Sequence, residues 1–161
     1  MGLLQFHGVK ILVDVRTVPR SRHNPQFNRD ALPASLAVGG IGYSHLAGLG
    51  GLRHAEPGSP NSGWKNASFR GFADYMQTGE FAENLGKLVD LGSDELAAIM
   101  CAEALPWRCH RSLIADALLI RGVVVAHIMG RSAPAAHRLT PFARVEGLRI
   151  VYPAAPGDSP P

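Results

Sequence analysis

The sequence has few charged residues and no long hydrophobic run. Charged residues make up 18% of the 161 residues, below the ~25% of average soluble domains, while hydrophobic residues make up 46%. This composition excludes a disordered chain and a coiled coil. Every apolar run is far shorter than the ~18 residues that a membrane-spanning helix needs, so we expect no membrane partner. Together 18 glycines and 12 prolines predict a packed core joined by substantial loops.

Cysteine is also scarce, and its two positions predict free thiols. Cys101 and Cys109 are too few for a disulfide scaffold. Residues 1–10 lack the charged start and long apolar segment of a secretory signal, so we expect a cytoplasmic protein. A chain of 161 residues has the size of one domain. We place this domain at residues 1–152, with a disordered proline-rich tail at Pro153–Pro161.

Lysine is scarce as well, since three of the 16 basic residues are lysines and 13 are arginines. A GC-rich genome would produce the same excess, so the positions of the arginines matter. The net charge of +3 is unevenly spread, because residues 1–55 and 101–161 are basic and residues 56–100 are acidic. A small net charge with local arginine clusters favours a focused anion pocket over a broad nucleic-acid surface.

The pattern of apolar residues predicts a three-layer α/β domain with a mainly parallel sheet. Three β-branched, nearly continuous apolar segments are typical of buried strands, namely Val9–Val15, Leu96–Cys101 and Val123–Met129. A helix at His110–Arg121 would join the last two in a βαβ unit. Other expected elements are helices at Asp30–Val38, Ser68–Met76 and Phe81–Leu91, a short strand at Ile41–His45 and a long loop at Ala47–Ala67.

Arginines follow the first predicted strand. Ligands of open parallel sheets bind beyond the carboxyl ends of the strands. Asp14 ends the strand, and the next loop contains Arg16, Arg20, Ser21 and Arg22. Guanidinium groups this close repel one another unless an acid or a bound anion neutralises them, so this loop indicates an anion site. A solvated arginine loop is the alternative.

Both cysteines follow the predicted strand at Leu96–Cys101. Cys109 precedes the predicted helix, and its neighbours are Arg108, His110 and Arg111. A helix N-terminus and nearby cations stabilise a thiolate, so Cys109 is the better candidate for a reactive thiol. Cys101, at the end of an apolar strand, is expected to be a small core residue. Buried, inert cysteine is the alternative for both.

Together these stretches predict a site for a phosphorylated or otherwise anionic small molecule, nucleotide-like ligands included. The expected nucleophilic or acid–base residues are Asp14, Glu103, Cys109 and His110. The expected ligand-binding residues are Arg16, Arg20, Ser21, Tyr43, His45, Arg108, Arg111 and Ser112. The protein would be an enzyme or a binding protein, and the sequence identifies no cofactor and no oligomeric state. A nucleic-acid-associated module and a noncatalytic interaction domain are the alternatives.

Known motifs narrow this hypothesis. Six residues instead of five separate Cys101 from Arg108, so a phosphatase-type loop does not fit. A zinc site would use Cys101, Cys109, His110 and His127, but their spacing is not a usual one for zinc ligands. No Walker loop or dinucleotide fingerprint is present in the sequence. We therefore expect no metal. The Gly50-Gly51 pair would let backbone approach a ligand, or would make a turn.

The same residues resemble a family called domain of unknown function 488, over about residues 8 to 143. The matching residues are Asp14-Val-Arg16, Pro19, Ser21, Phe27, Leu32, Gly40-Ile-Gly-Tyr43, His45, Leu49-Gly-Gly51, Met100-Cys-Ala-Glu103, Pro106, Cys109-His-Arg-Ser112, His127, His137 and Leu139-Thr140. The resemblance implies a Rossmann-like domain of bacteria and archaea with no agreed activity. Family members usually begin with an extra strand, carrying a Gly-His-Ser turn, and a helix. This sequence starts within that helix, at Met1–Gly8, so the extra strand is expected to be missing.

Overall fold

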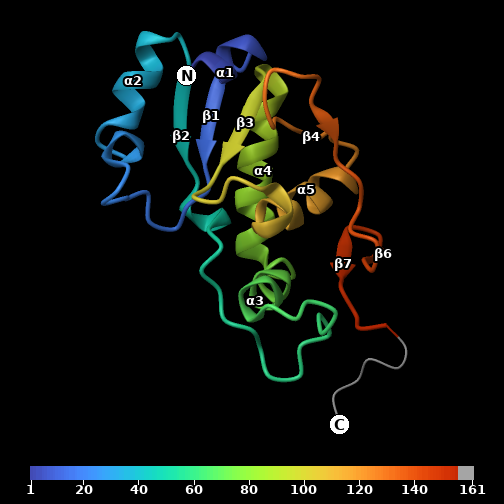
Figure 1. Ribbon diagram of the computed structural model, residues 1–161. Helices are drawn as coiled ribbons and strands as arrows, with labels where there is room; N and C mark the ends of the chain where they lie inside the picture. The colour runs from blue at the N-terminus through green and yellow to red at the C-terminus, as the bar shows by residue number, and fades with distance from the viewer. Residues whose placement is uncertain (156–161) are drawn as a thin grey trace.

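The computed structural model describes residues 1–155, and a three-stranded parallel sheet lies at its centre (Figure 1). Strand β1 (Ile11–Asp14) lies between β2 (Gly42–His45) and β3 (Ala97–Met100). The register pairs Asp14 with His45 on one side and with Met100 on the other. The carboxyl ends of the three strands therefore lie at one level, where polar residues from three loops can meet.

Helices cover both faces of this sheet (Figure 1). Helix α2 (Leu32–Val38) packs on one face, where Leu32 and Leu36 join Leu12 in a small core. Helices α4 (Gly79–Asp94) and α5 (Arg111–Leu119) cover the other face, and α3 (Ala67–Tyr75) packs with them in a larger core. The prediction of a three-layer, Rossmann-like α/β fold is confirmed.

Side-chain caps determine where two of these helices begin. The Asn66 side chain accepts hydrogen bonds from the backbone N–H groups of Ser68 (2.8 Å) and Phe69 (3.3 Å) and starts α3. Thr78 Oγ1 accepts from Phe81 N at 3.2 Å and starts α4. Gly79 is therefore the first residue of α4, because a capping hydroxyl satisfies an otherwise unpaired N–H of the first turn.

The predicted strand at Val123–Met129 is wrong in its length and its partner. Only Ala126–His127 (β4) is a strand, and it pairs antiparallel with β5 (Ala135–Ala136) outside the parallel sheet. Val123 and Val125 pack against the larger core, whereas Val124 is 94% exposed. The βαβ unit therefore does not form. An apolar run specifies burial, but the hydrogen-bonding partner of a strand depends on segments far away in sequence.

The remaining elements are short. Helix α1 (Gly2–Phe6) precedes the sheet, and a hairpin of β6 (Arg144–Glu146) and β7 (Arg149–Val151) follows it, with Gly147 at a φ of 59° in the turn. The described residues also include 3-10 helices at Pro25–Phe27 (η1), Ala47–Leu49 (η2) and Pro106–Arg108 (η3). Within residues 1–155, none of the helices has the length and hydrophobicity needed to cross a bilayer.

A buried carboxylate joins the C-terminal segment to α5. Asp116 has no exposed surface and accepts hydrogen bonds from the His137 ring (2.8 Å), the Thr140 backbone (3.0 Å) and the Tyr152 hydroxyl (2.9 Å). Beyond Tyr152, Ala154 N donates to Ser62 Oγ at 3.3 Å. The rest of the predicted disordered tail, from residue 156 on, lies outside the described residues.

Replacing Tyr152 with Phe tests this attachment, because the change leaves a buried carboxylate oxygen without its donor. We expect Y152F to lower the free energy of unfolding in urea by about 1.5–3 kcal/mol, the range for hydrogen bonds to charged groups. The matched control is Y75F, because the Tyr75 hydroxyl donates to a neutral carbonyl, that of Gly48, at 2.6 Å. That control should cost about 0.5–1.5 kcal/mol. Equal losses in the two variants would contradict the role of Asp116.

Candidate functional site

The polar residues at the carboxyl ends of the strands form two clusters on opposite faces of the sheet. Successive side chains of a strand point to opposite faces. Tyr43 and Met100 contact the smaller core beside α2, whereas Cys101 contacts the larger core beside α4 and α5. The residues after β1 and β2 therefore form one cluster, and those after β3 form another.

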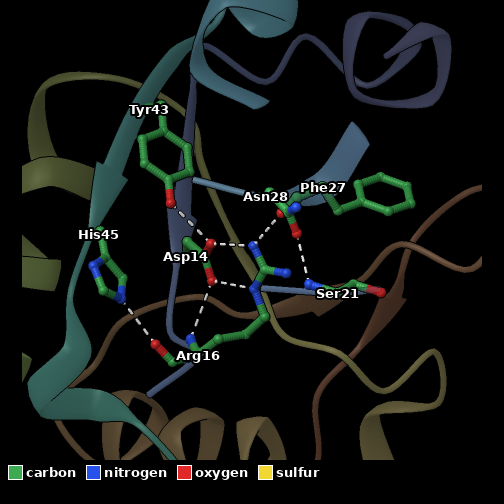
Figure 2. Close-up of polar contacts among 7 residues, drawn as sticks. All are labelled: Asp14, Arg16, Ser21, Phe27, Asn28, Tyr43 and His45. Carbon is green, nitrogen blue, oxygen red and sulfur yellow. Dashed lines mark hydrogen bonds and ion pairs between the residues drawn. The ribbon is translucent and has the colours of Figure 1, made fainter. Parts of the chain in front are cut away.

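The first cluster is centred on Asp14 (Figure 2). This fully buried carboxylate accepts from Arg16 Nε at 2.8 Å, from Arg16 Nη2 at 2.5 Å and from the Arg16 backbone N–H at 3.1 Å. The Tyr43 hydroxyl donates to it at 2.9 Å, from the neighbouring strand β2. Arg16 Nη2 also donates to the Phe27 carbonyl at 2.7 Å. The Arg16 side chain is thus held inside the protein by Asp14, which neutralises its charge.

These contacts determine the charges of the cluster. Burial opposes ionisation of Asp14, but hydrogen bonds from Arg16 and Tyr43 outweigh it and lower the pKa of this carboxyl. Burial and the hydrogen bond to the carboxylate raise the pKa of Tyr43 to about 12. Asp14 is therefore ionised and Tyr43 protonated at neutral pH. The His45 ring nitrogen lies 2.8 Å from the Arg16 carbonyl and completes the contact between the ends of β1 and β2.

The loop after β1 is folded by its own polar groups. Ser21 N donates to the Asn28 side chain at 2.6 Å, and Ser21 Oγ accepts from Asn24 N at 3.0 Å. Arg20 and Arg22 are exposed in this loop. The structure therefore brings Asp14, Arg16, Tyr43 and His45 together, whereas Arg20 lies at the surface.

The second cluster contains both cysteines. The Sγ atoms of Cys101 and Cys109 and a ring nitrogen of His110 all lie within 4.8 Å of one another. Cys109 is 3% exposed and lies two residues before the start of α5. Its Sγ accepts from the Arg111 backbone N–H at 3.5 Å and from Arg111 Nε at 3.4 Å, and it lies 3.6 Å from His110 Nδ1. The donors around this sulfur favour its ionised form.

The two thiols influence each other's ionisation. The hydrogen bond from Cys101, helped by His110 and the Arg111 backbone N–H, outweighs burial and lowers the pKa of Cys109 to about 3. The same hydrogen bond, burial and the negative charge of Cys109 raise the pKa of Cys101. The pair therefore holds a thiolate at Cys109 and a protonated thiol at Cys101. Two sulfurs and an imidazole are also ligand types that zinc accepts, so these three groups could hold such a metal.

The other predicted residues of the loop between β3 and α5 and of the first turn of α5 differ in their contacts and in their exposure. Arg111 Nη2 donates to the backbone carbonyls of Glu103 and of Ala104, the latter at 3.2 Å. Glu103 thus contacts Arg111 through its backbone, and the residue is exposed, as is Arg108. Ser112 Oγ donates to the Cys109 carbonyl at 3.0 Å and so supports the first turn of α5. The cluster therefore unites Cys101, Cys109, His110 and Arg111.

The glycine pair after β2 connects the loops of the site. A Cβ atom at Gly51 would collide with the His110 ring, and one at Gly50 would collide with Thr17. The loop can therefore approach both the end of β1 and the start of α5 only because these residues lack side chains. The His110 ring also lies against the Phe72 ring, with centroids 5.1 Å apart and the planes tilted by 54°. Its Nε2 is buried without a hydrogen bond within the described part of the chain. Sequence reasoning did not predict the close approach of Gly51 to His110, although a Gly-Gly pair is typical of a close backbone approach.

A cavity of about 590 Å³ lies along β3 and reaches the second cluster. Its walls include Ala97–Ile99 of β3, Leu88 of α4, Leu118 of α5 and residues 123–128. Arg111 lines this cavity and also contacts Cys109. The sequence could not reveal the cavity, because the predicted βαβ unit placed a strand in the sheet beyond β3.

The structure thus defines a three-layer α/β protein with a thiol cluster and a buried ion pair at the carboxyl end of its sheet. The chain belongs to the family described as Domain of unknown function DUF488, whose model matches residues 1–118. This match confirms the resemblance seen in the sequence, and it includes both clusters. Neither the curated proteins nor the solved structures contain a significant match to this chain.

The Asp14 cluster predicts a specific dependence of stability on pH. A carboxylate whose pKa is lowered by folding contributes stability above its unfolded pKa of about 3.9, and this contribution is lost as the pH falls through the lower folded pKa. We expect the wild-type chain to lose stability in acid more steeply than D14N in urea unfolding. At neutral pH, D14N should be less stable by on the order of 3 kcal/mol, because Arg16 is left buried without its partner.

The matched control for this experiment is E83Q. Glu83 is exposed, and Lys87 lies 2.7 Å from its carboxylate and lowers its pKa through a surface contact. Because water screens such a pair, E83Q should keep the acid dependence of the wild type. An unchanged acid dependence in D14N would contradict the assigned ionisation of Asp14.

The cysteine cluster predicts one thiolate in the folded chain at neutral pH. Ultraviolet absorbance of the thiolate should persist in the wild type down to about pH 4, because the pKa of Cys109 is lowered to about 3. In C109S the thiolate of Cys101 should appear only near about pH 8–9, the ordinary range of a free thiol. A thiolate that persists in C109S and disappears in C101S would reverse the assignment.

Proposed function

We propose that this protein is an enzyme that binds a small molecule with an anionic group and acts on it through the Cys109 thiolate. One observation carries this proposal: Arg111 lines the cavity beside β3, and its Nε lies 3.4 Å from Cys109 Sγ. A ligand whose anionic group binds Arg111 from the cavity would therefore lie beside the sulfur. The free thiols favour a reducing cytosol as its location.

The cavity suits a ligand that is apolar along most of its length. Its volume of about 590 Å³ falls within the ~300–1,000 Å³ range of small-molecule pockets. Ile99, Leu118 and Val125 supply apolar walls, whereas Arg111 and His127 supply polar groups. Arginine binds carboxylate and phosphate through paired hydrogen bonds, and the N-terminus of α5 favours the same charge. The ligand class is therefore a carboxylate or phosphate with an apolar body.

The residues of the cluster provide the parts of nucleophilic catalysis. An electron pair of Cys109 Sγ would form a bond to an electrophilic carbon or phosphorus atom, and the leaving group would depart with the bonding electrons. The protonated Cys101 thiol lies close enough to Cys109 to give the leaving group a proton, and the His110 ring lies beside the same sulfur. Water would then release the product and restore the thiolate. Asp14 and Arg16 are positioning residues here, because they lie on the other face of the sheet and hold the strand ends.

Alkylation by iodoacetamide tests this proposal, with hexyl phosphate as the probe ligand. We expect iodoacetamide to modify Cys109, and hexyl phosphate to protect it in a saturable way. In R111M the protecting concentration should rise about tenfold or more, since the loss of a charged hydrogen bond costs about 1.5–3 kcal/mol. The matched control is R144M, an exposed arginine of the β6–β7 hairpin, which should keep the wild-type protection.

Two outcomes would contradict the proposal. Protection that is equal in R111M and in the wild type would remove Arg111 from the binding site. The second outcome has two parts. Hexyl phosphate would not protect Cys109, and the chain would bind an oligonucleotide with an affinity that falls steeply with salt and does not depend on Arg111. That result would instead support the nucleic-acid alternative.

A further inference from the structure

The two thiols lie side by side although they belong to different elements. Cys101 directly follows β3, and Cys109 precedes α5, so the loop through η3 returns the chain to the same place. Their Sγ atoms lie within 4.8 Å of each other, whereas a disulfide requires ~2.05 Å. Rotation of one side chain can close a gap of this size. Cys101 lies in a loop and is partly exposed. Its Sγ accepts a hydrogen bond from Glu103 N at 3.2 Å, which rotation of this side chain toward Cys109 would break.

We propose that Cys101 and Cys109 form a reversible intramolecular disulfide, and that a hydroperoxide is its oxidant. This proposal concerns the same two cysteines as the small-molecule function proposed above, but it does not require that function, since it needs only the two sulfurs and the donors around them.

The reaction has two steps. The Cys109 thiolate attacks one oxygen of the peroxide, the O–O bond breaks, and the other oxygen leaves as hydroxide or alkoxide, which takes a proton from water. Cys109 is then a sulfenic acid. The Cys101 sulfur attacks the Cys109 sulfur, the S–O bond breaks, and the oxygen leaves as water with the Cys101 proton. The two sulfurs lose two electrons in total, and the two peroxide oxygens gain them.

The burial of Cys109 favours a small oxidant. This residue is 3% exposed, so a bulky disulfide such as oxidised glutathione would have to open the loop before reaching its sulfur. Hydrogen peroxide is little larger than water. Arg111 Nε lies 3.4 Å from the sulfur, where it can also stabilise the negative charge that develops on the leaving oxygen.

The first step prepares Cys101 for the second. While Cys109 is a thiolate, its negative charge and its hydrogen bond raise the pKa of Cys101 and keep that thiol protonated. A sulfenic acid at Cys109 is neutral, so this charge disappears when Cys109 is oxidised. The pKa of Cys101 then falls, and its sulfur becomes a better nucleophile. Arg111 donates to Cys109 Sγ through its backbone N–H at 3.5 Å and its Nε at 3.4 Å, whereas Cys101 is the partly exposed thiol of the loop. This geometry assigns Cys109 as the peroxide-reactive thiol and Cys101 as the resolving thiol.

Stoichiometric hydrogen peroxide tests the proposal on the full chain. We expect the wild type to lose both free thiols and two hydrogen atoms of intact mass without forming an intermolecular disulfide, and peptide mapping should show a Cys101–Cys109 link. Dithiothreitol should restore both thiols. In C101S, dimedone should trap a sulfenic acid at Cys109. In C109S, the remaining thiol should react at least about tenfold more slowly, because Cys101 is protonated at neutral pH.

Other results would overturn the proposal. One is a wild-type chain that gains oxygen at Cys109 without forming the link, and another is a chain that forms only intermolecular disulfides. A C109S chain that reacts as fast as the wild type would reverse the roles of the thiols. Zinc bound to the purified chain, with both thiols protected from peroxide until a chelator removes the metal, would assign the cluster to a metal site instead.

Discussion

The buried ion pair between Asp14 and Arg16 holds the carboxyl end of the sheet together. Asp14 ends the central strand, Tyr43 reaches it from β2, and Arg16 extends from it to the Phe27 carbonyl in η1. Removing one member would leave a buried charge unpaired, which is costly even where the intact pair adds little net stability. The main effect of the pair is therefore to restrict the segments after β1 and β2 to one arrangement. The position of β2, and with it the Gly50-Gly51 approach to His110, depends on that arrangement.

Arg16 and Arg111 have different roles, because they lie in different clusters. Arg16 is neutralised by Asp14 on the face beside α2, so it serves the structure of the strand ends. On the face beside α4 and α5, Arg111 contacts a sulfur and two backbone carbonyls instead of a carboxylate. Its positive charge thus lies beside the Cys109 thiolate. Together with the hydrogen bonds from Cys101 and His110, it allows a buried thiolate and a protonated thiol to exist side by side at neutral pH.

Much of the fold could be predicted because it depends on local patterns. The apolar segments that became β1, β2 and β3 and the amphipathic segments that became α3, α4 and α5 were predicted within a few residues of their ends. The segment at Val123–Met129 failed because its apolar character does not specify a partner. The Asp116 network with His137, Thr140 and Tyr152 holds the C-terminal part against α5 instead, and those residues are distant in sequence. The cavity along β3 has the same origin, because β4 pairs with β5 instead of joining the sheet beside β3.

By itself the sequence determined the family, the α/β class and the short stretches in which reactive residues gather. It did so because apolar periodicity, helix capping and residue spacing are local properties. Only the tertiary structure decided that Asp14 neutralises Arg16, that Glu103 meets Arg111 through its backbone, and that Cys101 lies next to Cys109. The charge and reactivity of a side chain depend on the atoms within a few ångströms of it, and folding brings those atoms from distant parts of the chain.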